Sequence, residues 1–423
     1  MHVIVVGGGI GGLTTALSLH AAGISVEVHE QVAELKPLGV GINLLPHAVR
    51  ELTELGLQDR LAAIAIPTRE LIYANRHGQE IWREARGREA GYGWPQFSIH
   101  RGWLQMLLLD VAKERIGADR IFTDHAVSGF EDDGRRVVAR FVGNDGSDRG
   151  TATGDVLIAC DGIHSAVRKT FYPDEGPPKW NGCVLWRGTT EGPPYLSGRS
   201  MVMAGHQDQK FVCYPISAEH AGRGRSLINW IAEIRFRDRD LWRRESWNRQ
   251  GDLAEFLPAF EGWAFDWLDV PGVIRGGGIV YEYPMVDRDP LERWTFGRAT
   301  LLGDAAHPMS PIGSNGASQA ILDARTIAWH LATAPDVETG LARYEEDRRP
   351  ATSRIVLANR GNGPEQVMQL AEERASGGFS NVEDVIPRAE LERIAADYKR
   401  TAGFEVERLN TRPSLTPPGR VGG

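Results

Sequence analysis

The first twelve residues constrain the fold of this chain more than any other segment. Val3-Ile4-Val5-Val6 is a continuous apolar run, which is typical of a strand buried on both faces of a parallel sheet. Gly7-Gly8-Gly9-Ile10-Gly11-Gly12 follows, and residues 13–22 then have the apolar pattern of a helix that packs against a sheet. Residues 25–29 form the next short strand. This order predicts a β-α-β unit and therefore an α/β fold.

The glycine-rich turn has the spacing G-x-G-x-x-G, in which each glycine has a physical purpose. Gly7 permits a tight turn, Gly9 lets a pyrophosphate approach the backbone, and Gly12 lets the helix lie close to the strand. The helix that begins near Ile10 offers free N–H groups and a partial positive charge to the phosphates. Glu30, which ends the second strand, can accept hydrogen bonds from a ribose and would repel a 2′-phosphate. The unit is therefore predicted to bind FAD or NAD rather than NADP.

Length and composition limit the other possibilities. At 423 residues the chain exceeds the ~250–300 residues at which one core stops growing, so two domains are expected. A net charge of −8 without a basic stripe argues against a nucleic-acid partner. The three cysteines fit neither a metal site nor a disulfide framework and indicate a reducing compartment. The sequence contains no run of ~20 apolar residues, so no membrane-spanning helix is predicted. We expect a cytoplasmic protein that is monomeric or homodimeric and binds no metal.

Two further turns follow apolar strands later in the chain. One is Cys160-Asp161-Gly162-Ile163-His164-Ser165-Ala166-Val167-Arg168, and the other is Gly303-Asp304-Ala305-Ala306-His307-Pro308. Together with the N-terminal glycines, these segments resemble the three signatures of the single-component flavoprotein aromatic hydroxylases, the group of p-hydroxybenzoate hydroxylase and salicylate hydroxylase. Their order and spacing match over about residues 1–350. Three signatures in register are far more specific than a single glycine-rich turn.

The resemblance is strongest for the phenazine-modifying branch, the 5-methylphenazine-1-carboxylate 1-monooxygenases. The segments that carry it are residues 37–43, 98–102, 186–188, 283–290 and 313–320. The last ~60 residues add nothing to it. The resemblance implies that NADH or NADPH binds transiently and reduces FAD, and that O2 then forms a flavin C4a-hydroperoxide. This species would hydroxylate an aromatic or heteroaromatic, phenazine-like acid, with or without decarboxylation, and no side chain is named as catalytic.

The resemblance also implies a domain arrangement. A Rossmann-like FAD-binding domain would comprise residues 1–70, 98–176 and 278–350. An antiparallel β-sheet substrate domain of residues 71–97 and 177–277 would be inserted into it, because tryptophans and strand-like alternation concentrate there. Residues 351–423 would form a C-terminal helical tail, rich in Pro and Gly from about Arg412 and frayed at its end. The charged run of residues 235–244 is expected to be a solvated loop.

Several residues acquire expected roles from this resemblance. Arg101 would reach the ribityl and pyrophosphate groups, Asp304 the ribityl chain, and Asp161 the region where the nicotinamide approaches. Val127 would contact the adenine through its backbone. The full set expected at the cofactor is Gly7, Gly9, Ile10, Gly12, Glu30, Gly39, Gly41, Arg101, Val127, Asp161, Asp304, Pro311, Gly313, Asn315, Gly316 and Ala317. The alternative roles are a helix cap for Asp304 and a surface ion pair for Arg101.

The substrate is expected to bind in a dry aromatic pocket between the two domains. The candidates for its wall are Tyr73, Trp94, Trp186, Arg187, Met203, Tyr214 and Trp230. Arg187 could anchor a substrate carboxylate, or it could be a structural arginine on a strand. Buried aromatic residues are more often plain core than ligand contacts. Swapping Trp186 or Tyr214 is expected to alter turnover more than flavin content.

Two other functions remain compatible with these residues. One is a different flavoenzyme class on the same fold, such as an epoxidase, a reductase or a halogenase, although the halogenase signature W-x-W-x-I-P is absent. The other is a non-enzymatic redox sensor that binds FAD. A monooxygenase consumes NAD(P)H and O2 together and places one oxygen atom in its product, which distinguishes it from both.

Overall fold

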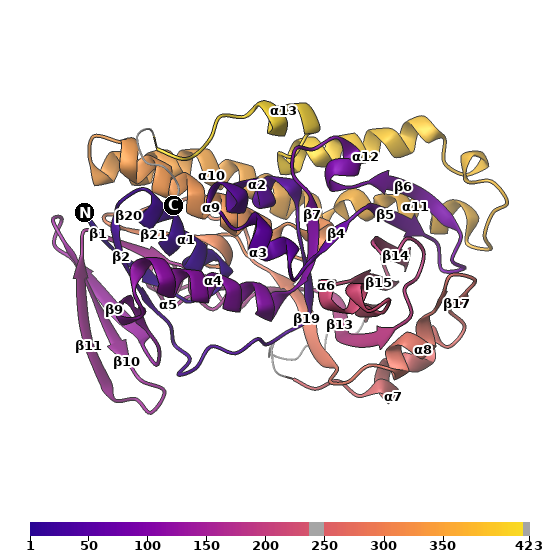
Figure 1. Cartoon of the computed structure of the whole chain (residues 1–423), viewed down its shortest axis with the longest axis horizontal. Coiled ribbons are helices and arrows are strands. Elements are labelled where there is room, and N and C mark those ends of the chain that lie inside the picture. The colour runs from indigo at the N-terminus through magenta and orange to yellow at the C-terminus, as the bar shows by residue number, and fades with distance from the viewer. Residues whose placement is uncertain (237–248, 418–423) are drawn as a thin grey trace.

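The first structural unit is a parallel sheet with helices on one face and a small sheet on the other (Figure 1). The structure is a computed structural model that describes residues 1–236 and 249–417. Within these residues the sheet has the order β20-β21-β12-β1-β2-β8, and only the pair β20–β21 is antiparallel. Its strands are β1 (His2–Val6), β2 (Ser25–His29), β8 (Ile121–Phe122), β12 (Val156–Ala159), β20 (Thr295–Phe296) and β21 (Ala299–Leu301).

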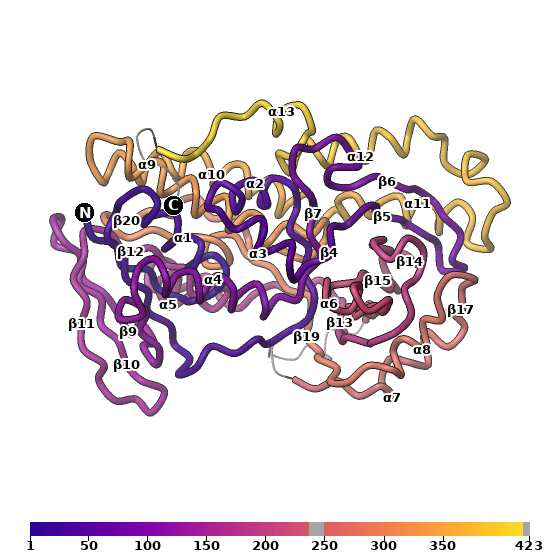
Figure 2. The backbone as a smooth tube through the Cα atoms, viewed as in Figure 1, coloured from indigo at the N-terminus to yellow at the C-terminus, as the bar shows by residue number. Residues whose placement is uncertain are grey.

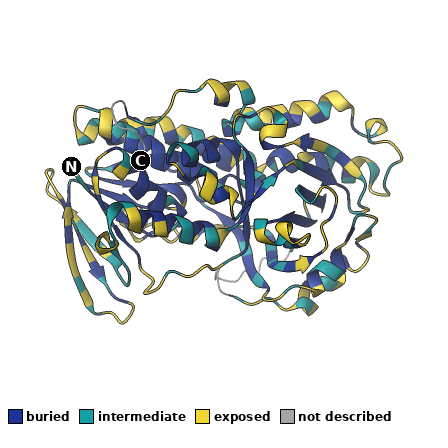
Figure 3. Ribbon diagram, viewed as in Figure 1, coloured by how far each residue is buried: buried dark blue, intermediate teal, exposed yellow. Residues whose placement is uncertain are grey.

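Strand order explains where a ligand can bind. From β1 the chain first adds β2 on one side and later β12 on the other, so the strand order reverses between β1 and β12. Open α/β sheets bind ligands at such a reversal, outside the carboxyl ends of the strands. The expected N-terminal β-α-β unit is confirmed, since β1 and β2 pair in parallel and α1 (Ile10–Ala21) connects them. Figure 3 shows that this unit is largely buried, as the apolar sequences of β1 and α1 require.

Helices and a second sheet cover this unit. Against α1 lie α4 (Arg101–Ile116) and α9 (Gly316–Thr333), and α10 (Val337–Arg360) packs on α9. The opposite side contacts a three-stranded sheet of β9 (Ala126–Asp132), β10 (Val137–Val142) and β11 (Asp148–Gly154). The expected hairpin around Asp133-Gly134 is confirmed.

The second large unit is a seven-stranded sheet of order β19-β13-β16-β15-β14-β5-β6. All pairs are antiparallel except β14–β5, which is parallel and departs from the expected antiparallel arrangement. The strands are β5 (Glu70–Ala74), β6 (Glu80–Ala85), β13 (Lys179–Gly192), β14 (Ser200–His206), β15 (Gln209–Pro215), β16 (Ser226–Arg235) and β19 (Tyr281–Asp287). β19 lies in the segment expected in the FAD-binding domain. Because it pairs with β13, the second sheet extends to Asp287.

Each face of the second sheet packs against different elements. One face contacts α11 (Gln366–Ala375) and α12 (Arg388–Ala402) of the C-terminal region. The other face contacts α7 (Leu253–Phe256), α8 (Val270–Arg275) and the 3-10 turn Leu257–Phe260. A small sheet of β3 (Gly41–Leu44), β7 (Gln96–His100) and β4 (Ile66–Thr68) lies where the chain passes between the two large sheets. Five shorter helices complete this description: α2 (Pro46–Glu54), α3 (Gln58–Ala62), α5 (Ala166–Phe171), α6 (Ala218–Gly222) and α13 (Val406–Thr411).

The end of the chain is more ordered than its composition predicts. After α13, Arg412 forms an ion pair with Glu51, and Arg50 donates to the carbonyl oxygens of Arg412 and Pro413 at 2.8 and 2.9 Å. Figure 2 shows this segment returning past α2. The expectation that the chain frays from Arg412 is therefore wrong for the segment up to Pro413, because buried charges on α2 hold it.

Other expectations fall outside the described part of the chain. Of the charged run 235–244, only the first two residues are described, and Trp242 and Trp247 are not. The final residues 418–423 also lie outside. Among the helices that the structure describes, none is long and apolar enough to cross a membrane.

Candidate active site

Three turns meet at the carboxyl edge of the parallel sheet. Backbone hydrogen bonds continue the sheet beyond its strands, from Gly7 to His29 at 2.7 Å, from Cys160 to Val6 at 2.7 Å, and from Leu302 to Ala159 at 2.9 Å. The glycine turn, the turn with Asp161 and the turn with Asp304 therefore start side by side. This is the arrangement that one ligand contacting all three would need.

The first turn tolerates no larger residues at two of its glycines. A Cβ on Gly7, whose φ is +105°, would lie 2.4 Å from the carbonyl oxygen of Cys160, and one on Gly12 would lie 1.9 Å from that of Gly7. Gly9 differs, since a Cβ added there would have no atom of the described residues within 4 Å. The space at Gly9 opens at the N-terminus of α1, where no side chain caps the helix and no acid occupies the first turn. This is an anion-binding cradle of backbone N–H groups.

Glu30 has a second function that its position in the sequence does not reveal. Its carboxylate accepts hydrogen bonds from the backbone N–H of Gly8 at 2.5 Å and of Val32 at 2.9 Å, so it braces the glycine turn. Each carboxylate oxygen retains capacity to accept another hydrogen bond, as a ribose would require. The backbone N–H of His125 donates to the carbonyl oxygen of Glu30 at 2.9 Å, which brings Val127 near this end of the site.

Arg101 and Asp304 face the same opening without bonding to each other. Both side chains are exposed, and neither makes a hydrogen bond or ion pair with any residue in the described ranges. Burial within the cleft raises the pKa of Asp304, while the charges of His307 and Arg101 lower it. Burial lowers the pKa of Arg101, while Asp304 raises it. Both side chains reach solvent and are nevertheless surrounded by protein atoms, as in a cleft. Among the described residues, Arg101 forms no surface ion pair and the Asp304 side chain caps no helix, so neither alternative role is supported.

Asp161 lies in the turn that follows β12. One carboxylate oxygen accepts from the backbone N–H of Ala166 at 2.9 Å, and the other, Oδ1, is buried without a partner among the described residues. Burial raises the pKa of this carboxyl group. A buried acceptor without a partner is costly unless a ligand donor satisfies it.

The segment before β3 connects the cleft to the second sheet. Arg101 donates its backbone N–H to Val40 at 2.8 Å, and Gly39 has a φ of +100°. The carbonyl oxygen of Gly41 then accepts from Arg187 at 2.7 Å and from Tyr214 at 2.9 Å. Arg187 and Tyr214 thus hold the backbone of this segment, which is the structural alternative for Arg187.

The loop that precedes α9 includes Pro311, Gly313 and Asn315 of the expected cofactor set, and Gly316 and Ala317 begin the helix. Gly313 and Ser314 both have positive φ, +70° and +56°, so the chain turns sharply before the helix. Asn315 is fully buried and donates to the hydroxyl of Tyr398 on α12 at 2.8 Å. No described side chain caps α9 and its first turn holds no acid, so its N-terminal N–H groups are available to a ligand.

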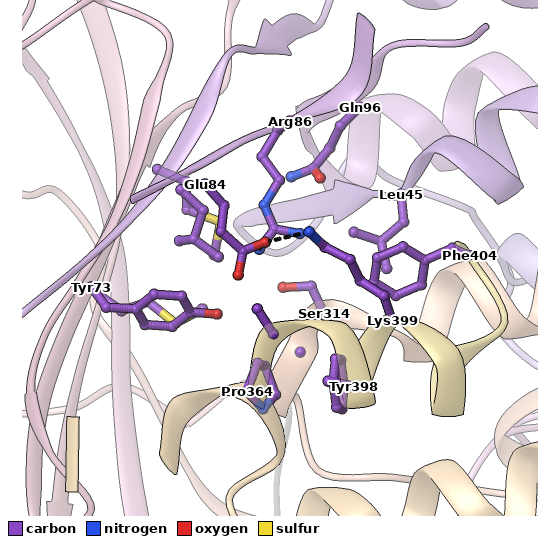
Figure 4. A pocket seen from close by; sticks show the side chains of 15 residues that line it. Leu45, Tyr73, Glu84, Arg86, Gln96, Ser314, Pro364, Tyr398, Lys399 and Phe404 are labelled. Carbon is purple, nitrogen blue, oxygen red and sulfur yellow. Dashed lines mark ion pairs between the residues drawn. The ribbon is translucent and has the colours of Figure 1, made fainter. Parts of the chain in front are cut away.

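A pocket adjoins this loop, and Figure 4 shows its side chains. It has an empty volume of about 400 Å³, counted up to and including its open side. Gly313 and Ser314 line it, and Tyr73 and Met203 are the two members of the expected substrate set that it contains. The residues that line it are Leu45, Leu71, Tyr73, Glu84, Arg86, Gln96, Met201, Met203, Gly313, Ser314, Pro364, Ala395, Tyr398, Lys399 and Phe404.

The tryptophans expected in this wall lie elsewhere, and strand alternation explains two of them. Trp186 is 2% exposed and stacks on Phe256 with ring centroids 4.8 Å apart, on the sheet face away from the pocket. Trp230 lies on that same face and donates to Thr190 at 3.0 Å. Trp94 instead lies under the guanidinium of Arg50, whose Cζ is 5.3 Å from the centroid of the Trp94 ring. The expectation that Trp94, Trp186 and Trp230 line this pocket is therefore corrected: all three occupy structural positions.

Sequence reasoning missed the charged end of the pocket. Glu84 lies in β6, Arg86 directly follows that strand, Gln96 begins β7, and Lys399 lies in α12. Opposite charges two residues apart, at Glu84 and Arg86, were a local signal that both side chains share one face of a strand. Nothing in the sequence connects them with Lys399.

The chain is similar to known proteins in both sequence and fold. Residues 1–217 and 285–359 match the sequence family described as "FAD binding domain". The chain is 49% identical over 362 residues to the phenazine 1,6-dicarboxylic acid hydroxylase PhzS of Lysobacter antibioticus, covering 85% of this chain and 89% of that protein. It is 30% identical over 373 residues to the 3-hydroxybenzoate 6-hydroxylase of Polaromonas naphthalenivorans, covering 86% and 87%. Klebsiella pneumoniae HpxO, solved with FAD and uric acid, has the same fold, with a TM-score of 0.73 at 24% identity over 94% of this chain and 97% of that one.

Proposed function

This chain belongs to the FAD binding domain family, and on that premise we propose that it hydroxylates a phenazine-like aromatic acid, with NADH or NADPH as reductant and O2 as oxygen donor. It is an oxidoreductase of the FAD-dependent aromatic monooxygenase class, as are its relatives by name. The substrate, the reductant and the roles of individual residues are the proposed part.

The residues present fit FAD at each point where it would be held. The open space at Gly9 and the uncapped N-terminus of α1 suit a pyrophosphate, and Glu30 keeps acceptor capacity for a ribose. Arg101 and Asp304 are unbonded in the cleft and suit the phosphate and ribityl groups, respectively. FAD bound here would supply the hydride acceptance and oxygen activation that no amino-acid side chain provides.

The protein's own contribution is orientation and electrostatics. The N-terminus of α9 directs unpaired N–H groups and a partial positive charge to the place where the isoalloxazine ring would lie. Gly313 and Ser314, in the turn just before this helix, also line the pocket. This shared wall is the observation that carries the proposal, because a ring bound in the pocket would lie beside the same loop as the cofactor. The largely buried side chains around it exclude water, which this chemistry requires.

The substrate class rests on two observations. The relative from Lysobacter antibioticus is named as a hydroxylase of a phenazine dicarboxylic acid, and the match covers most of this chain. The pocket also combines apolar walls, from Leu71, Met201 and Phe404, with a charged end. A flat aromatic acid meets both requirements.

The test starts with purified protein. We expect it to be yellow, to release FAD on denaturation, and to oxidise NADH or NADPH faster when phenazine-1-carboxylate or phenazine-1,6-dicarboxylate is added. One atom of labelled O2 should enter the product, and mass analysis of that product separates simple hydroxylation from hydroxylation with loss of CO2. Reductant oxidation that no aromatic acid stimulates, or a product without labelled oxygen, would overturn the proposal.

We also propose that the enzyme works in a reducing, cytoplasmic environment as a monomer or homodimer. The three cysteines are free, and burial raises the pKa of the thiols of Cys160, Cys183 and Cys213. Such thiols are poorly reactive. Size-exclusion chromatography with light scattering would measure the oligomeric state.

A further inference from the structure

The pocket beside residues 311–315, the loop before α9 that we call the flavin loop because the isoalloxazine ring is proposed to lie beside it, has a charged end built from distant parts of the chain. Glu84 Oε2 lies 2.9 Å from Lys399 Nζ and 3.6 Å from an Arg86 nitrogen. Glu84 and Arg86 are 7% and 8% exposed, and Lys399 reaches them from α12. Figure 4 shows the three charged groups meeting above the Ser314 loop.

The charges of this cluster do not balance. Burial raises the pKa of Glu84, but the charges of Arg86 and Lys399 outweigh it and lower that pKa below its usual value, so the carboxylate is ionised at neutral pH. Burial lowers the pKa of Arg86, but Glu84 and neighbouring tyrosines raise it, so the guanidinium stays charged. One carboxylate therefore faces two cations. Lys399 is partly exposed, but the Arg86 guanidinium is buried, and excess positive charge beside a buried group favours binding of an anion.

Buried polar atoms around the cluster also lack partners. Tyr73 Oη, Arg86 Nε and Gln96 Oε1 make no hydrogen bond to another described residue, although their side chains are 0%, 8% and 2% exposed. Burial raises the pKa of Tyr73 well above its usual value, so its hydroxyl stays protonated and can donate. Three unsatisfied groups in one pocket are unusual in a folded protein and indicate a ligand that satisfies them.

On the basis of the function proposed above, we propose that this end of the pocket binds the carboxylate of the aromatic substrate, which Arg86 and Lys399 hold while Tyr73 and Gln96 hydrogen-bond to the ligand. The ring would then extend along Leu71, Met201 and Met203 toward Ser314. The carboxylate would thereby set which edge of the ring reaches the flavin loop.

This proposal gives the C-terminal region a direct part in specificity. Lys399 lies beyond residue 359, where the match to the FAD binding domain family ends. The fold common to the family therefore supplies Arg86, while the tail supplies the second cation. Enzymes of this fold with a different tail would lack the acid-binding pair.

The test compares a charged ligand with a neutral one of the same shape. The variants are Lys399→Met, Lys399→Arg and Arg393→Met, measured in the FAD-loaded enzyme. Arg393 is a matched control because it is an exposed cation on the same helix. Dissociation constants for phenazine-1-carboxylate and phenazine-1-carboxamide come from the change in flavin absorbance on titration.

We expect Lys399→Met to weaken binding of the carboxylate about 10- to 100-fold, the usual effect of losing a charge-assisted hydrogen bond, and that of the carboxamide less than about threefold. Lys399→Arg should restore most of the carboxylate affinity, and Arg393→Met should change neither. Equal weakening of both ligands by Lys399→Met would show a structural role and overturn the inference, as would unchanged carboxylate binding. FAD content and melting temperature identify a general loss of folding, which is not expected because Lys399 is 28% exposed.

Product analysis beside these titrations separates this inference from the proposed function. If the wild type hydroxylates phenazines while Lys399→Met weakens carboxylate and carboxamide binding equally, the enzyme remains a phenazine monooxygenase but its acid-binding pair is disproved. A wild-type enzyme that hydroxylates no aromatic compound overturns the proposed function itself.

Discussion

The proposed cofactor side and the proposed substrate side of this site are built in different ways. On the cofactor side, backbone N–H groups, carbonyl oxygens and missing Cβ atoms form the surface, all in turns that directly follow strands. On the substrate side, side chains from β5, β6, β14 and α12 form the wall. Backbone geometry demands particular residues at particular spacings, whereas a wall of side chains can be assembled from any elements that meet. The first therefore leaves a motif in the sequence, and the second does not.

The largest effect should come from breaking the backbone side. In Gly12→Val a Cβ would lie 1.9 Å from the carbonyl oxygen of Gly7, a contact that side-chain movement cannot relieve. We expect the free energy of unfolding to fall by more than about 4 kcal/mol, measured by urea denaturation. Gly9→Ala is the control, because the space beside its backbone is open; it should fold normally but retain little FAD. A stable, FAD-containing Gly12→Val protein would contradict this account of the turn.

The next effect separates the two faces of the substrate sheet. Trp186→Ala removes a ring stacked on Phe256 and should lower the free energy of unfolding by about 3–4 kcal/mol without changing which aromatic acid is preferred. Met203→Ala, on the pocket face, should instead change KM for the substrate. Thermal unfolding and steady-state kinetics measure the two quantities. A changed substrate preference in Trp186→Ala, at normal stability, would restore this residue to the pocket wall.

A smaller effect tests the polar cleft. Because Asp304 makes no hydrogen bond to another described residue, Asp304→Ala should leave the stability of the apoprotein unchanged. Its affinity for FAD should fall about 10-fold or more, since a hydrogen bond to a charged group contributes about 1.5–3 kcal/mol. Fluorescence titration of the apoprotein with FAD measures this. Unchanged FAD affinity would remove Asp304 from the proposed site.

Tyr398→Phe tests the contact between the two sides. The Tyr398 hydroxyl accepts from Asn315 and donates to Asn359 at 3.0 Å, so it couples the flavin loop to α12. Its loss should cost about 1 kcal/mol of stability and lower the fraction of oxidised NADH that ends in hydroxylated product. FAD content should remain normal. If product yield per NADH is unchanged while stability falls, Tyr398 has a structural role alone.

The smallest effect is a pH dependence at the charged end. The pKa of Glu84 is lower in the folded protein than its ordinary value, so the stability it contributes is complete above that ordinary pKa of about 4.5. This contribution is lost as the pH falls through the lowered pKa. Melting temperature between pH 3 and pH 7 should therefore fall more steeply in the wild type than in Glu84→Gln. Parallel curves would show that Glu84 contributes no such linkage.

Much of the fold followed from local pattern, and the failures have two causes. The strand of Val3 to Val6, the helix after Gly12 and the hairpin at Asp133-Gly134 are set by neighbours in the sequence, and each was predicted. β19 was assigned to the wrong unit because its pairing with β13 spans a hundred residues. Trp186 and Arg187 were both placed in the pocket, although adjacent residues on a strand face opposite sides.

The sequence by itself determined the three turns of the proposed cofactor site, because backbone geometry requires glycine at Gly7 and Gly12, and Glu30, Asp161 and Asp304 each lie within a few residues of a strand end. Only the tertiary structure decided the proposed substrate pocket. Glu84 and Lys399 are far apart in the chain, and their charges meet only because α12 packs against the second sheet. A contact between distant segments depends on how whole elements pack, and packing leaves no fixed spacing in the sequence.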